Sequence, residues 1–276
     1  MARVWSQFAR YVPLMALKNK KQLGQHWLHD RDTLEHIADC ADLKSNDTVL
    51  EVGPGLGTLT SVLLRRAQQV VAVEFDEELA RKLPGQFPGK NLSVLHQDIL
   101  QFDTSTLVKG YKVVANVPYY ITSKIIQKFM TDVNRPSVVV LLIQKEVAER
   151  AAAKPGEMSI LAVSAQLYAD VSLGDVVDAE LFTPPPKVDS QVLILTPKAP
   201  DLPANVQEKQ FFRIVKAGFS AKRKKLRSSL SGGLALEKTA VEALLQSVDI
   251  SADALAEDLS LDEWRRIVEA YYSTGY

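Results

Sequence analysis

The sequence contains few of the residues that form covalent or metal cross-links. One cysteine, Cys40, and four histidines are spread over 276 residues. A single cysteine cannot close an internal disulfide, and so small a set of cysteine and histidine cannot form the usual zinc cluster. We therefore expect no metal site. The lone cysteine favours a reducing compartment, which we take to be the cytoplasm.

Long apolar runs and an excess of either charge are also missing. No apolar run approaches the ~20 residues that a membrane-spanning helix needs, so we expect no contact with a membrane. The formal net charge is zero, and a polyanionic partner would therefore have to meet a local basic patch. We expect a globular protein that is monomeric.

Basic residues are concentrated in two segments. Every charged residue among residues 1–29 is positive, and a second basic run spans residues 216–227. The second run contains Lys222, Arg223, Lys224, Lys225 and Arg227. After Arg227 the chain becomes acidic. Opposite charges are thus separated along the sequence, which supplies the local patch that the overall balance does not.

The basic N-terminal segment has two interpretations. We predict that residues 1–19 form a basic arm outside the folded domain. The absence of acids, together with Arg3 and Arg10 among apolar residues, also resembles a mitochondrial transit segment. Arg10 and Pro13 interrupt the apolar part, which argues against a secretory signal.

Short runs of β-branched residues alternate with helical patterns through the first two thirds of the chain. The predicted strands are residues 48–52, 70–75, 92–96, 112–115 and 137–143. Helices are predicted over residues 123–130 and 159–168, and Asp30 is expected to cap another before the first strand. Such alternation predicts an α/β fold with a parallel sheet that is covered on both faces.

The last third of the chain has a different pattern. Residues 171–177 and 188–195 also resemble strands, and the segment between them is too short for a crossover helix. We expect them to pair antiparallel at one edge of the sheet. The proline-rich residues 196–203 are predicted as a linker between a first domain, residues 20–200, and a small helical domain, residues 205–276.

A glycine-rich loop follows the first predicted strand. Its sequence is Glu51-Val52-Gly53-Pro54-Gly55-Leu56-Gly57. Glycine lets the backbone pass close to a ligand, so Gly53 and Gly55 are candidates for nucleotide binding. The dinucleotide fingerprint requires a glycine where Thr58 stands, and the pattern favours methyltransferases over nicotinamide-binding proteins. A nicotinamide-binding loop and a turn that merely needs glycine are the alternatives.

Two acids follow the next predicted strands. Glu74 ends the second strand, where a carboxylate can accept both ribose hydroxyl groups of an adenosine. Asp98 follows the third strand and can accept from the exocyclic amine of an adenine. Because ligands of open α/β sheets bind at the carboxyl ends of the strands, the loop and both acids are expected to share one site.

The segment Asn116-Val117-Pro118-Tyr119 follows the fourth predicted strand and should face the same crevice. The amino nitrogen of adenine is a poor nucleophile, because its lone pair is delocalised into the ring. The side-chain carbonyl of Asn116 and the backbone carbonyl of Val117 can accept both amine hydrogens and localise that lone pair. Pro118 fixes the peptide, and Tyr119 can stack on an extruded base. A strand-to-helix turn with a buried tyrosine is the alternative.

These motifs together resemble the ribosomal RNA small-subunit adenine N6,N6-dimethyltransferase family. Besides the motifs above, the resemblance rests on residues 21–28, Gln97 to Leu100, and Phe182 to Ser190. It covers about residues 20–272. It implies a Rossmann-like class I methyltransferase sheet with an antiparallel edge strand, plus the small C-terminal helical domain. Trp27 stands where the family usually has phenylalanine.

The resemblance also implies a role for individual residues and a cofactor. S-adenosyl-L-methionine would be bound by His26, Leu28, Gly53, Gly55, Glu74, Asp98 and Asn116. Tyr119 and Phe182 would bracket the target adenine. The basic run from Lys222 to Arg227 would contact phosphates of the RNA without reading its sequence. The implied substrate is a pair of adjacent adenosines near the 3′ end of small-subunit ribosomal RNA, within a pre-ribosomal particle.

Three alternatives remain at this point. A related group methylates one adenine of large-subunit ribosomal RNA and confers macrolide resistance, and the Pro-Lys-Val-Asp-Ser stretch argues against it. A binding protein with the same fold could act in ribosome assembly or as a mitochondrial transcription factor. The intact glycine loop and residues 116–119 argue against lost chemistry. Residues 116–119 alone would also suit a DNA methyltransferase.

Overall fold

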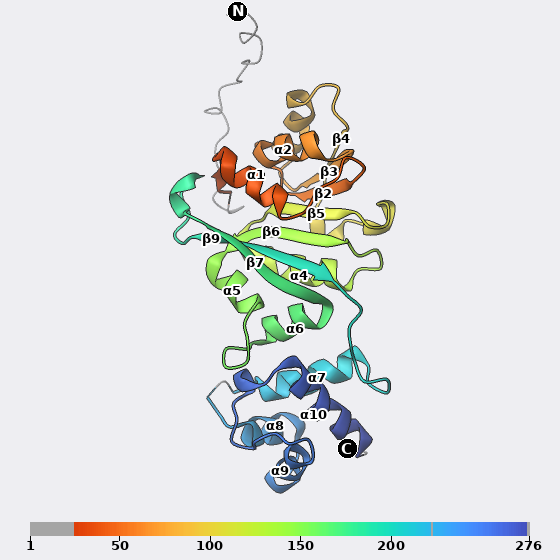
Figure 1. Cartoon of the computed structure of the whole chain (residues 1–276), viewed down its shortest axis with the longest axis vertical. Helices are drawn as coiled ribbons and strands as arrows, with labels where there is room; N and C mark the ends of the chain where they lie inside the picture. The colour runs from red at the N-terminus through yellow and green to blue at the C-terminus, as the bar shows by residue number, and fades with distance from the viewer. Residues whose placement is uncertain (1–24, 222, 275–276) are drawn as a thin grey trace, which may run out of the picture.

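The computed structural model describes residues 25–221 and 223–274 (Figure 1). A mixed sheet with helices on both faces forms one part of the molecule, and a group of helices at the C-terminal end forms the other. The predicted fold class is therefore confirmed. The predicted basic arm, residues 1–19, lies outside the described residues.

The helices and strands occupy the following segments. The strands are β1 (Trp27–Leu28), β2 (Thr48–Val52), β3 (Gln69–Glu74), β4 (Leu92–His96), β5 (Lys112–Asn116), β6 (Val138–Gln144), β7 (Ala169–Val177), β8 (Phe182–Thr183) and β9 (Ser190–Pro197). The α-helices are α1 (Arg31–Asp39), α2 (Thr58–Arg66), α3 (Glu77–Lys82), α4 (Thr122–Thr131), α5 (Lys145–Ala151), α6 (Ile160–Tyr168), α7 (Glu208–Gly218), α8 (Leu226–Leu234), α9 (Lys238–Ser247) and α10 (Leu261–Ser273).

The main sheet has seven strands in the order β4-β3-β2-β5-β6-β9-β7. Strands β2 to β6 pair in parallel, as the alternation of strands and helices predicts. β9 pairs antiparallel with β6 and with β7, so the hairpin-like pair lies at one edge as expected. The strand that runs against the others is β9, one place in from the edge, and β7 is the edge strand itself.

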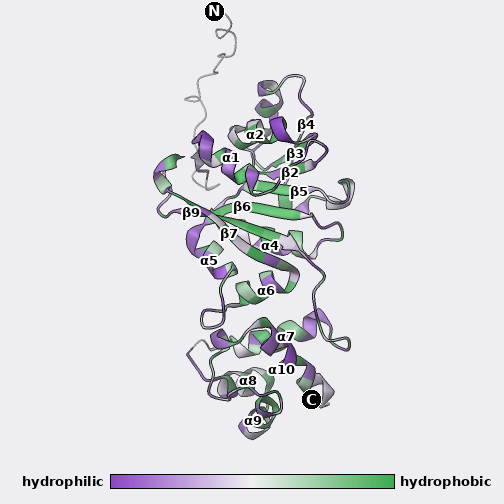
Figure 2. Cartoon of the chain, viewed as in Figure 1, coloured by the Kyte–Doolittle hydropathy of each residue, from purple (hydrophilic) through white to green (hydrophobic). Residues whose placement is uncertain are grey.

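Side chains alternate between the two faces of the sheet. Along β5, Val114 belongs to the apolar cluster under α1 and α2, whereas Val113 and Ala115 belong to the cluster under α4 and α6. All three are fully buried. Strands that are covered on both faces read as continuous apolar runs, and these strands are accordingly the greenest segments in Figure 2.

The C-terminal helices share the core of one sheet face. Phe211 of α7 and Trp264 of α10 are fully buried, and they belong to the same apolar cluster as Phe129 of α4. The side chain of Trp264 packs so closely on Gly218 that a Cβ there would lie 2.2 Å from the indole. Packing thus continues from the sheet into these helices.

Local sequence signals explain several helix starts. The side chain of Asp30 accepts a hydrogen bond from the backbone of Thr33 and caps α1, as predicted. Ser159 caps α6 in the same way, and Ser260 forms a capping box with Glu263 at the start of α10. Within the described part of the chain, no helix is long and apolar enough to cross a membrane.

Candidate active site

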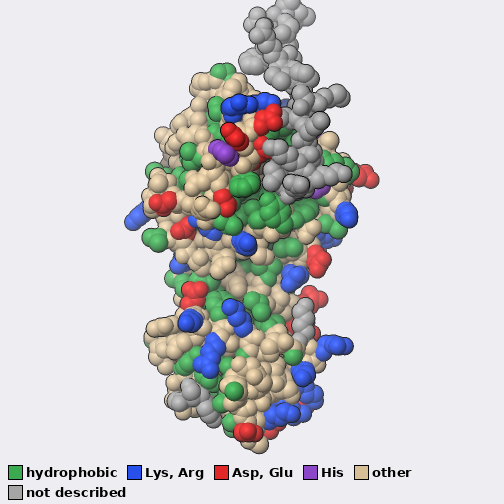
Figure 3. All heavy atoms as spheres, turned by 180° about the vertical axis from the view of Figure 1, so that it is seen from behind, with side chains coloured by type: hydrophobic (Ala, Val, Ile, Leu, Met, Phe, Trp, Pro, Cys, Tyr) green, Lys and Arg blue, Asp and Glu red, His purple; other side chains and the backbone are tan. Residues whose placement is uncertain are grey.

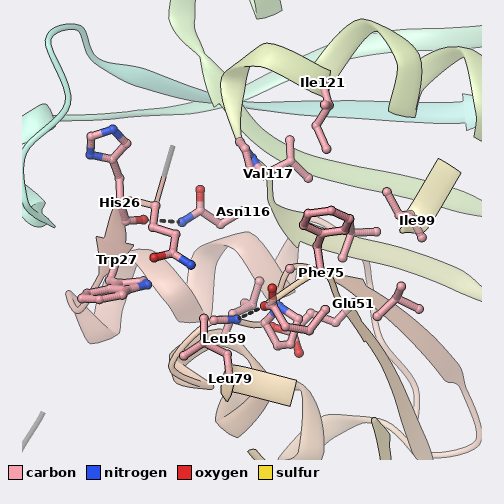
Figure 4. A pocket seen from close by; sticks show the side chains of 18 of the residues that line it. His26, Trp27, Glu51, Leu59, Phe75, Leu79, Ile99, Asn116, Val117 and Ile121 are labelled. Atoms are coloured by element: carbon pink, nitrogen blue, oxygen red, sulfur yellow. Dashed lines mark hydrogen bonds between the residues drawn. The ribbon is translucent and has the colours of Figure 1, made fainter. Parts of the chain in front are cut away.

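A cavity of about 340 Å³ lies at the carboxyl edge of the sheet. Its walls come from the ends of β2, β3 and β5 and from the segment after β4, where open α/β sheets bind ligands. Figure 4 shows His26 and Trp27 on one side of it and Phe75 and Ile99 on the other. The predicted site residues that line it are His26, Leu28, Gly53, Gly55, Glu74, Asp98, Asn116, Val117, Pro118 and Tyr119.

The glycine loop approaches this cavity in a conformation that glycine favours. Gly53, Gly55 and Gly57 have φ angles of 65°, 56° and 82°. At Gly57, which immediately precedes α2, a Cβ would lie 2.7 Å from Leu83 Cδ1 and 3.0 Å from Phe87 Cε2. The third glycine of the motif therefore serves the packing of the loop, and Gly53 and Gly55 line the cavity.

Glu74 connects the end of β3 to this loop. One oxygen of its carboxyl group accepts from the backbone N–H of Gly55 at 3.0 Å, and the other accepts from that of Asp76 at 2.9 Å. Burial raises the pKa of Glu74, although these N–H groups favour the ionised form and oppose the shift. Each oxygen has a second lone pair, so the carboxyl group can still accept hydrogen bonds from a ligand.

Glu51 is a second buried acid in the cavity wall. Its side chain is 1% exposed, and one of its oxygens accepts from Thr60 Oγ1 at 2.6 Å. Burial raises the pKa of Glu51 to about 8, and the nearby charge of Glu74 adds to the shift. The sequence prediction treated Glu51 only as part of the loop motif. An acid near the end of an otherwise apolar strand, two residues before the first glycine, is the sequence feature that could have identified Glu51 as a site residue.

The side of the cavity away from His26 and Trp27 combines Asp98 with the apolar side chains of Phe75 and Ile99. One oxygen of Asp98 accepts from the backbone of Leu100 at 2.9 Å. Beside it, Ile99 is buried, whereas Phe75 is 59% exposed although it is a large aromatic side chain. Both line the cavity next to the acids of the strand ends. An exposed aromatic here provides a flat apolar surface for a ring system, which the sequence prediction did not identify.

Asn116 is oriented by the backbone of His26. Its side-chain Nδ2 donates to the backbone oxygen of His26 at 3.3 Å (Figure 4). The amide is thus held with its nitrogen toward His26, which leaves the carbonyl oxygen for another donor. The following peptide is fixed as well, because the backbone N–H of Val117 donates to the oxygen of Leu142 at 3.3 Å. The side chain of Val117 is buried in the core.

Tyr119 is held at both ends of its side chain. Its hydroxyl group hydrogen-bonds with Ser190 Oγ at 2.9 Å, and burial raises its pKa. Its ring stacks on that of His26, with centroids 6.0 Å apart and planes at 20°. His26 in turn hydrogen-bonds through Nδ1 with the oxygen of Pro184 at 2.8 Å. A base that stacks on Tyr119 must therefore use the other face of the ring.

Comparison with known proteins decides the family. A family model described as ribosomal RNA adenine dimethylase matches residues 16–273. The chain belongs to the ribosomal RNA adenine dimethylase family. Ribosomal RNA small subunit methyltransferase A of Dehalococcoides mccartyi (strain CBDB1) is 41% identical over 259 residues, which are 92% of this chain and 89% of that relative. The protein of the same name from Nostoc sp. (strain PCC 7120) is 39% identical, with 91% and 97% covered.

Two solved structures are also similar over most of the chain. A dimethyladenosine transferase from Plasmodium falciparum gives a TM-score of 0.76 at 26% identity, covering 91% of this chain and 98% of that one. The 23S rRNA methyltransferase ErmE gives 0.71 at 29% identity, covering 88% and 98%. Membership of the adenine dimethylase family confirms that the chain is a methyltransferase.

Residues 25–28 of this dimethylase family member reach the cavity through a small second sheet. β1 pairs antiparallel with β8, with Leu28 opposite Phe182. Trp27 lies against the glycine loop. A Cβ on Gly55 would lie 3.4 Å from its indole ring. The indole Nε1 is buried and has no hydrogen-bond partner among the described residues.

Phe182 is the one predicted base contact that the structure does not bring to the cavity. Its side chain is 3% exposed and belongs to the apolar cluster that contains Leu28 and Leu34. The pairing of β8 with β1 holds it in the core of this structure, and its contact with a base stays a prediction. Nearby, Tyr120 is 63% exposed and does line the cavity.

The predicted basic run lies away from this cavity and is partly neutralised. Lys225 pairs with Asp253 at 2.9 Å, and Arg227 pairs with Asp253 at 3.1 Å and with Glu242 at 3.4 Å. Arg223 and Lys224 are exposed, and Lys222 lies outside the described residues. RNA binding by this run stays a prediction.

Proposed function

We propose that this chain uses S-adenosyl-L-methionine to dimethylate the N6 amino groups of two adjacent adenosines near the 3′ end of small-subunit ribosomal RNA. The observation that carries the proposal is the shared cavity. Residues 116–119, suited to an adenine amine, and the glycine loop with Glu74 and Asp98, suited to a nucleoside cofactor, line it together. The small-subunit assignment is supported by the names of the relatives from Dehalococcoides and Nostoc.

The residues present fit the proposed cofactor. Glu74 and Asp98 provide acceptors for ribose hydroxyl groups and an exocyclic amine, and Phe75 provides an apolar face for an adenine ring. Glu51 and Glu74 are buried acids, which would be favoured as anions beside a positively charged ligand. The indole N–H of Trp27, which has no hydrogen-bond partner among the described residues, is a donor suited to a carboxylate. When bound, the cofactor supplies an electrophilic methyl group.

The chain itself prepares the target nitrogen. The side-chain oxygen of Asn116 and the backbone oxygen of Val117 would accept the two hydrogens of the adenine amine, which localises the lone pair on nitrogen. The hydrogen bond from Asn116 Nδ2 to His26 keeps the correct end of the amide available. Tyr119, fixed by Ser190, would stack on the base, an interaction worth roughly 1–3 kcal/mol.

No side chain is needed to remove a proton before methyl transfer. The neutral amine becomes positively charged as it gains the methyl group, and its proton is then acidic enough to pass to solvent. Positioning of the two reacting atoms accounts for most of the rate. The same arrangement serves a second transfer, since the methylated amine keeps one hydrogen for one of the two carbonyl acceptors.

Partners and location follow from this proposal. The target would be presented by a pre-ribosomal particle, and the protein would act there as a monomer in the cytoplasm. The formal net charge is zero, but basic residues are concentrated in residues 1–29 and 216–227, which fits a protein that meets RNA through local patches.

Large-subunit ribosomal RNA is the second candidate substrate. The solved structure of the 23S rRNA methyltransferase ErmE covers 88% of this chain at a TM-score of 0.71. The fold and cavity alone would suit either RNA.

Parallel methylation of the two RNAs tests the proposal. Purified protein and labelled S-adenosylmethionine are incubated with unmethylated small-subunit particles and with large-subunit RNA, and the modified nucleosides are identified by mass spectrometry. We expect N6,N6-dimethyladenosine at two adjacent positions of the small-subunit RNA. Label only in large-subunit RNA would transfer the assignment to the second candidate. Cofactor binding without label in either RNA would contradict both and favour a binding protein.

A further inference from the structure

The carboxyl group of Glu51 is enclosed by the protein. Glu51 lies near the end of β2, on the sheet face that α2 covers, and Thr60 of α2 donates to one of its oxygens at 2.6 Å. The side chain is 1% exposed, and it lines the active-site cavity (Figure 4). On the face shown in Figure 3, by contrast, acidic and basic side chains are interspersed at the surface, where water solvates their charges.

No cation among the described residues pairs with Glu51. Within residues 25–221 and 223–274, neither Glu51 nor Glu74 forms a salt bridge, and Lys124, the one lysine that lines the cavity, is exposed to solvent. Two acids, Glu74 and Asp76, are buried together at the end of β3. The titratable side chains that line the cavity besides Glu51 are Glu74 from β3, Asp98 from the segment after β4, Tyr119, Tyr120 and Lys124 from the segments after β5, and His26 from the segment before β1.

These surroundings keep a proton on Glu51 while the cavity is empty. Burial disfavours a charged carboxylate, and the nearby carboxyl group of Glu74 adds repulsion between like charges. Thr60 alone favours the ionised form. The pKa of Glu51 is accordingly raised to about 8. At neutral pH the empty cavity therefore contains a buried acid that a positive charge can ionise.

The cofactor of the proposed reaction and its product differ by one positive charge at sulfur. S-adenosylmethionine has a sulfonium, an ammonium and a carboxylate group, so its net charge is positive. S-adenosylhomocysteine has a neutral thioether in place of the sulfonium, and its net charge is zero. A positive charge close to a buried carboxyl group lowers its pKa, and the uncharged product lacks this effect.

We propose that Glu51 is a specificity-determining residue that releases its proton when S-adenosylmethionine binds and regains one when S-adenosylhomocysteine is formed. This role rests on the proposed function for the identity of the cofactor. The proton passes to solvent on binding and returns from solvent once the sulfonium has become a thioether, so protons balance over one cycle. The cavity thereby holds the charged cofactor more tightly than the uncharged product. Product can then leave between the successive transfers that dimethylation requires.

The test counts protons by isothermal titration calorimetry in two buffers of different ionisation enthalpy, phosphate and Tris. The ligands are S-adenosylmethionine, S-adenosylhomocysteine and sinefungin, in which an amino group replaces the methylsulfonium group. The full-length proteins are the wild type, Glu51→Gln and the control Glu149→Gln, an exposed acid of α5 that does not line the cavity. Binding is measured at pH 6 and 7, below the pKa of about 7.7–8.0 of an α-amino group.

We expect the wild type and Glu149→Gln to release about one proton for each S-adenosylmethionine or sinefungin bound at pH 7, and none for S-adenosylhomocysteine. Their Kd for S-adenosylmethionine should be about fivefold to tenfold lower at pH 7 than at pH 6, because releasing one proton makes binding tighter as pH rises. Glu51→Gln cannot ionise. It should release no proton, bind S-adenosylmethionine about tenfold more weakly than the wild type at pH 7, and bind S-adenosylhomocysteine within about twofold.

The other outcomes separate Glu51 from the proposed function. No proton release by the wild type, with normal methylation of small-subunit particles, would overturn the role of Glu51 alone, and this result does not depend on any variant. Equal release by the wild type and Glu51→Gln would assign the proton to another group, and equal release with S-adenosylhomocysteine would show that the sulfonium charge is not sensed; either would overturn the proposal. The expected release without methyl transfer to either RNA would support Glu51 and contradict the proposed function. Failure of the wild type to bind S-adenosylmethionine would contradict both.

Discussion

The two walls of the active-site cavity are held together over very different distances in the sequence. One wall, which we call the cofactor wall, is formed by the glycine loop with Glu51 and Glu74. In it, the backbone of Gly55 bonds to Glu74, 19 residues away, and Thr60 bonds to Glu51, 9 residues away. The other wall, which we call the base wall, is formed by residues 116–119. In it, the side chain of Asn116 bonds to the backbone of His26, 90 residues away. The cofactor wall is thus local, and the base wall is assembled from three remote parts of the chain.

The geometry of each wall therefore depends on different structural features. The cofactor wall depends on backbone conformation and on buried acids at the ends of neighbouring strands. The base wall depends on side-chain orientation that is imposed by residues near the N-terminus and in β9, such as Ser190 behind Tyr119. Substitutions in one wall should therefore change cofactor binding, and substitutions in the other should change methyl transfer.

The largest expected effect is on catalysis by the base wall. Asn116→Ala removes one acceptor for the adenine amine, and preorganised groups of this kind are worth about a hundredfold to a thousandfold in kcat. Methyl incorporation into small-subunit particles should fall by that factor, whereas RNA affinity should be retained. Asn91→Ala, which removes an exposed amide that bonds to Gln68, is the matched control. Full activity of Asn116→Ala would show that the amine is not held in this way.

The local wall was the easier one to predict. Glycine at fixed spacing after a β-branched run, and acids at the next strand ends, are sequence patterns with a direct structural cause, and these residues do line one cavity. The strand bounds were also predicted closely, because strands buried on both faces read as continuous apolar runs.

The remote contacts could not be predicted in the same way. The partner of Tyr119 is Ser190, and no periodicity links residues 71 positions apart. The register of β8 on β1 buries Phe182, and two-residue strands leave no pattern in the sequence from which this packing could be predicted. Likewise, the basic run near Lys225 was visible in the sequence, while the acids that neutralise it lie in other segments.

A second prediction concerns the pH dependence of stability in the cofactor wall. Glu51 has a pKa of about 8 in the folded protein and about 4.5 when unfolded. Between these values the folded state holds a proton that the unfolded state has lost, so the free energy of unfolding falls as pH rises and becomes constant above about 8. Glu51→Gln should remove this dependence, which amounts to a few kcal/mol.

Urea unfolding of both proteins at pH 5, 6, 7, 8 and 9 measures the difference. The difference between variant and wild type isolates Glu51, since other titrating groups are common to both. We expect the variant to gain stability relative to the wild type as pH rises from 5 to 8. A constant difference over that range would mean that Glu51 is not held neutral in the folded protein.

A third prediction tests whether the cofactor wall depends on backbone conformation. Gly57→Ala places a Cβ 2.7 Å from Leu83 at a φ of 82°, and overpacking of this kind costs about 1–3 kcal/mol. The affinity for S-adenosylmethionine should fall with stability. Gly85→Ala is the control, because nothing lies within 4 Å of its added Cβ. Equal stability of the two variants in urea would show that the loop can adjust.

The smallest expected effect is on the long-range bond of the base wall. Tyr119→Phe keeps the ring but removes the hydroxyl group that bonds to Ser190, and a bond of this kind contributes about 0.5–1.5 kcal/mol. Because the bond orients the ring, the KM for RNA should rise about threefold to tenfold, while the Kd of S-adenosylmethionine stays unchanged. Ser190→Ala should have a similar effect, and the double variant should be little worse than either single one, since both remove the same interaction. Additive losses in KM would mean that Ser190 acts on the RNA independently of Tyr119, and a change in cofactor affinity would mean that the two walls are coupled.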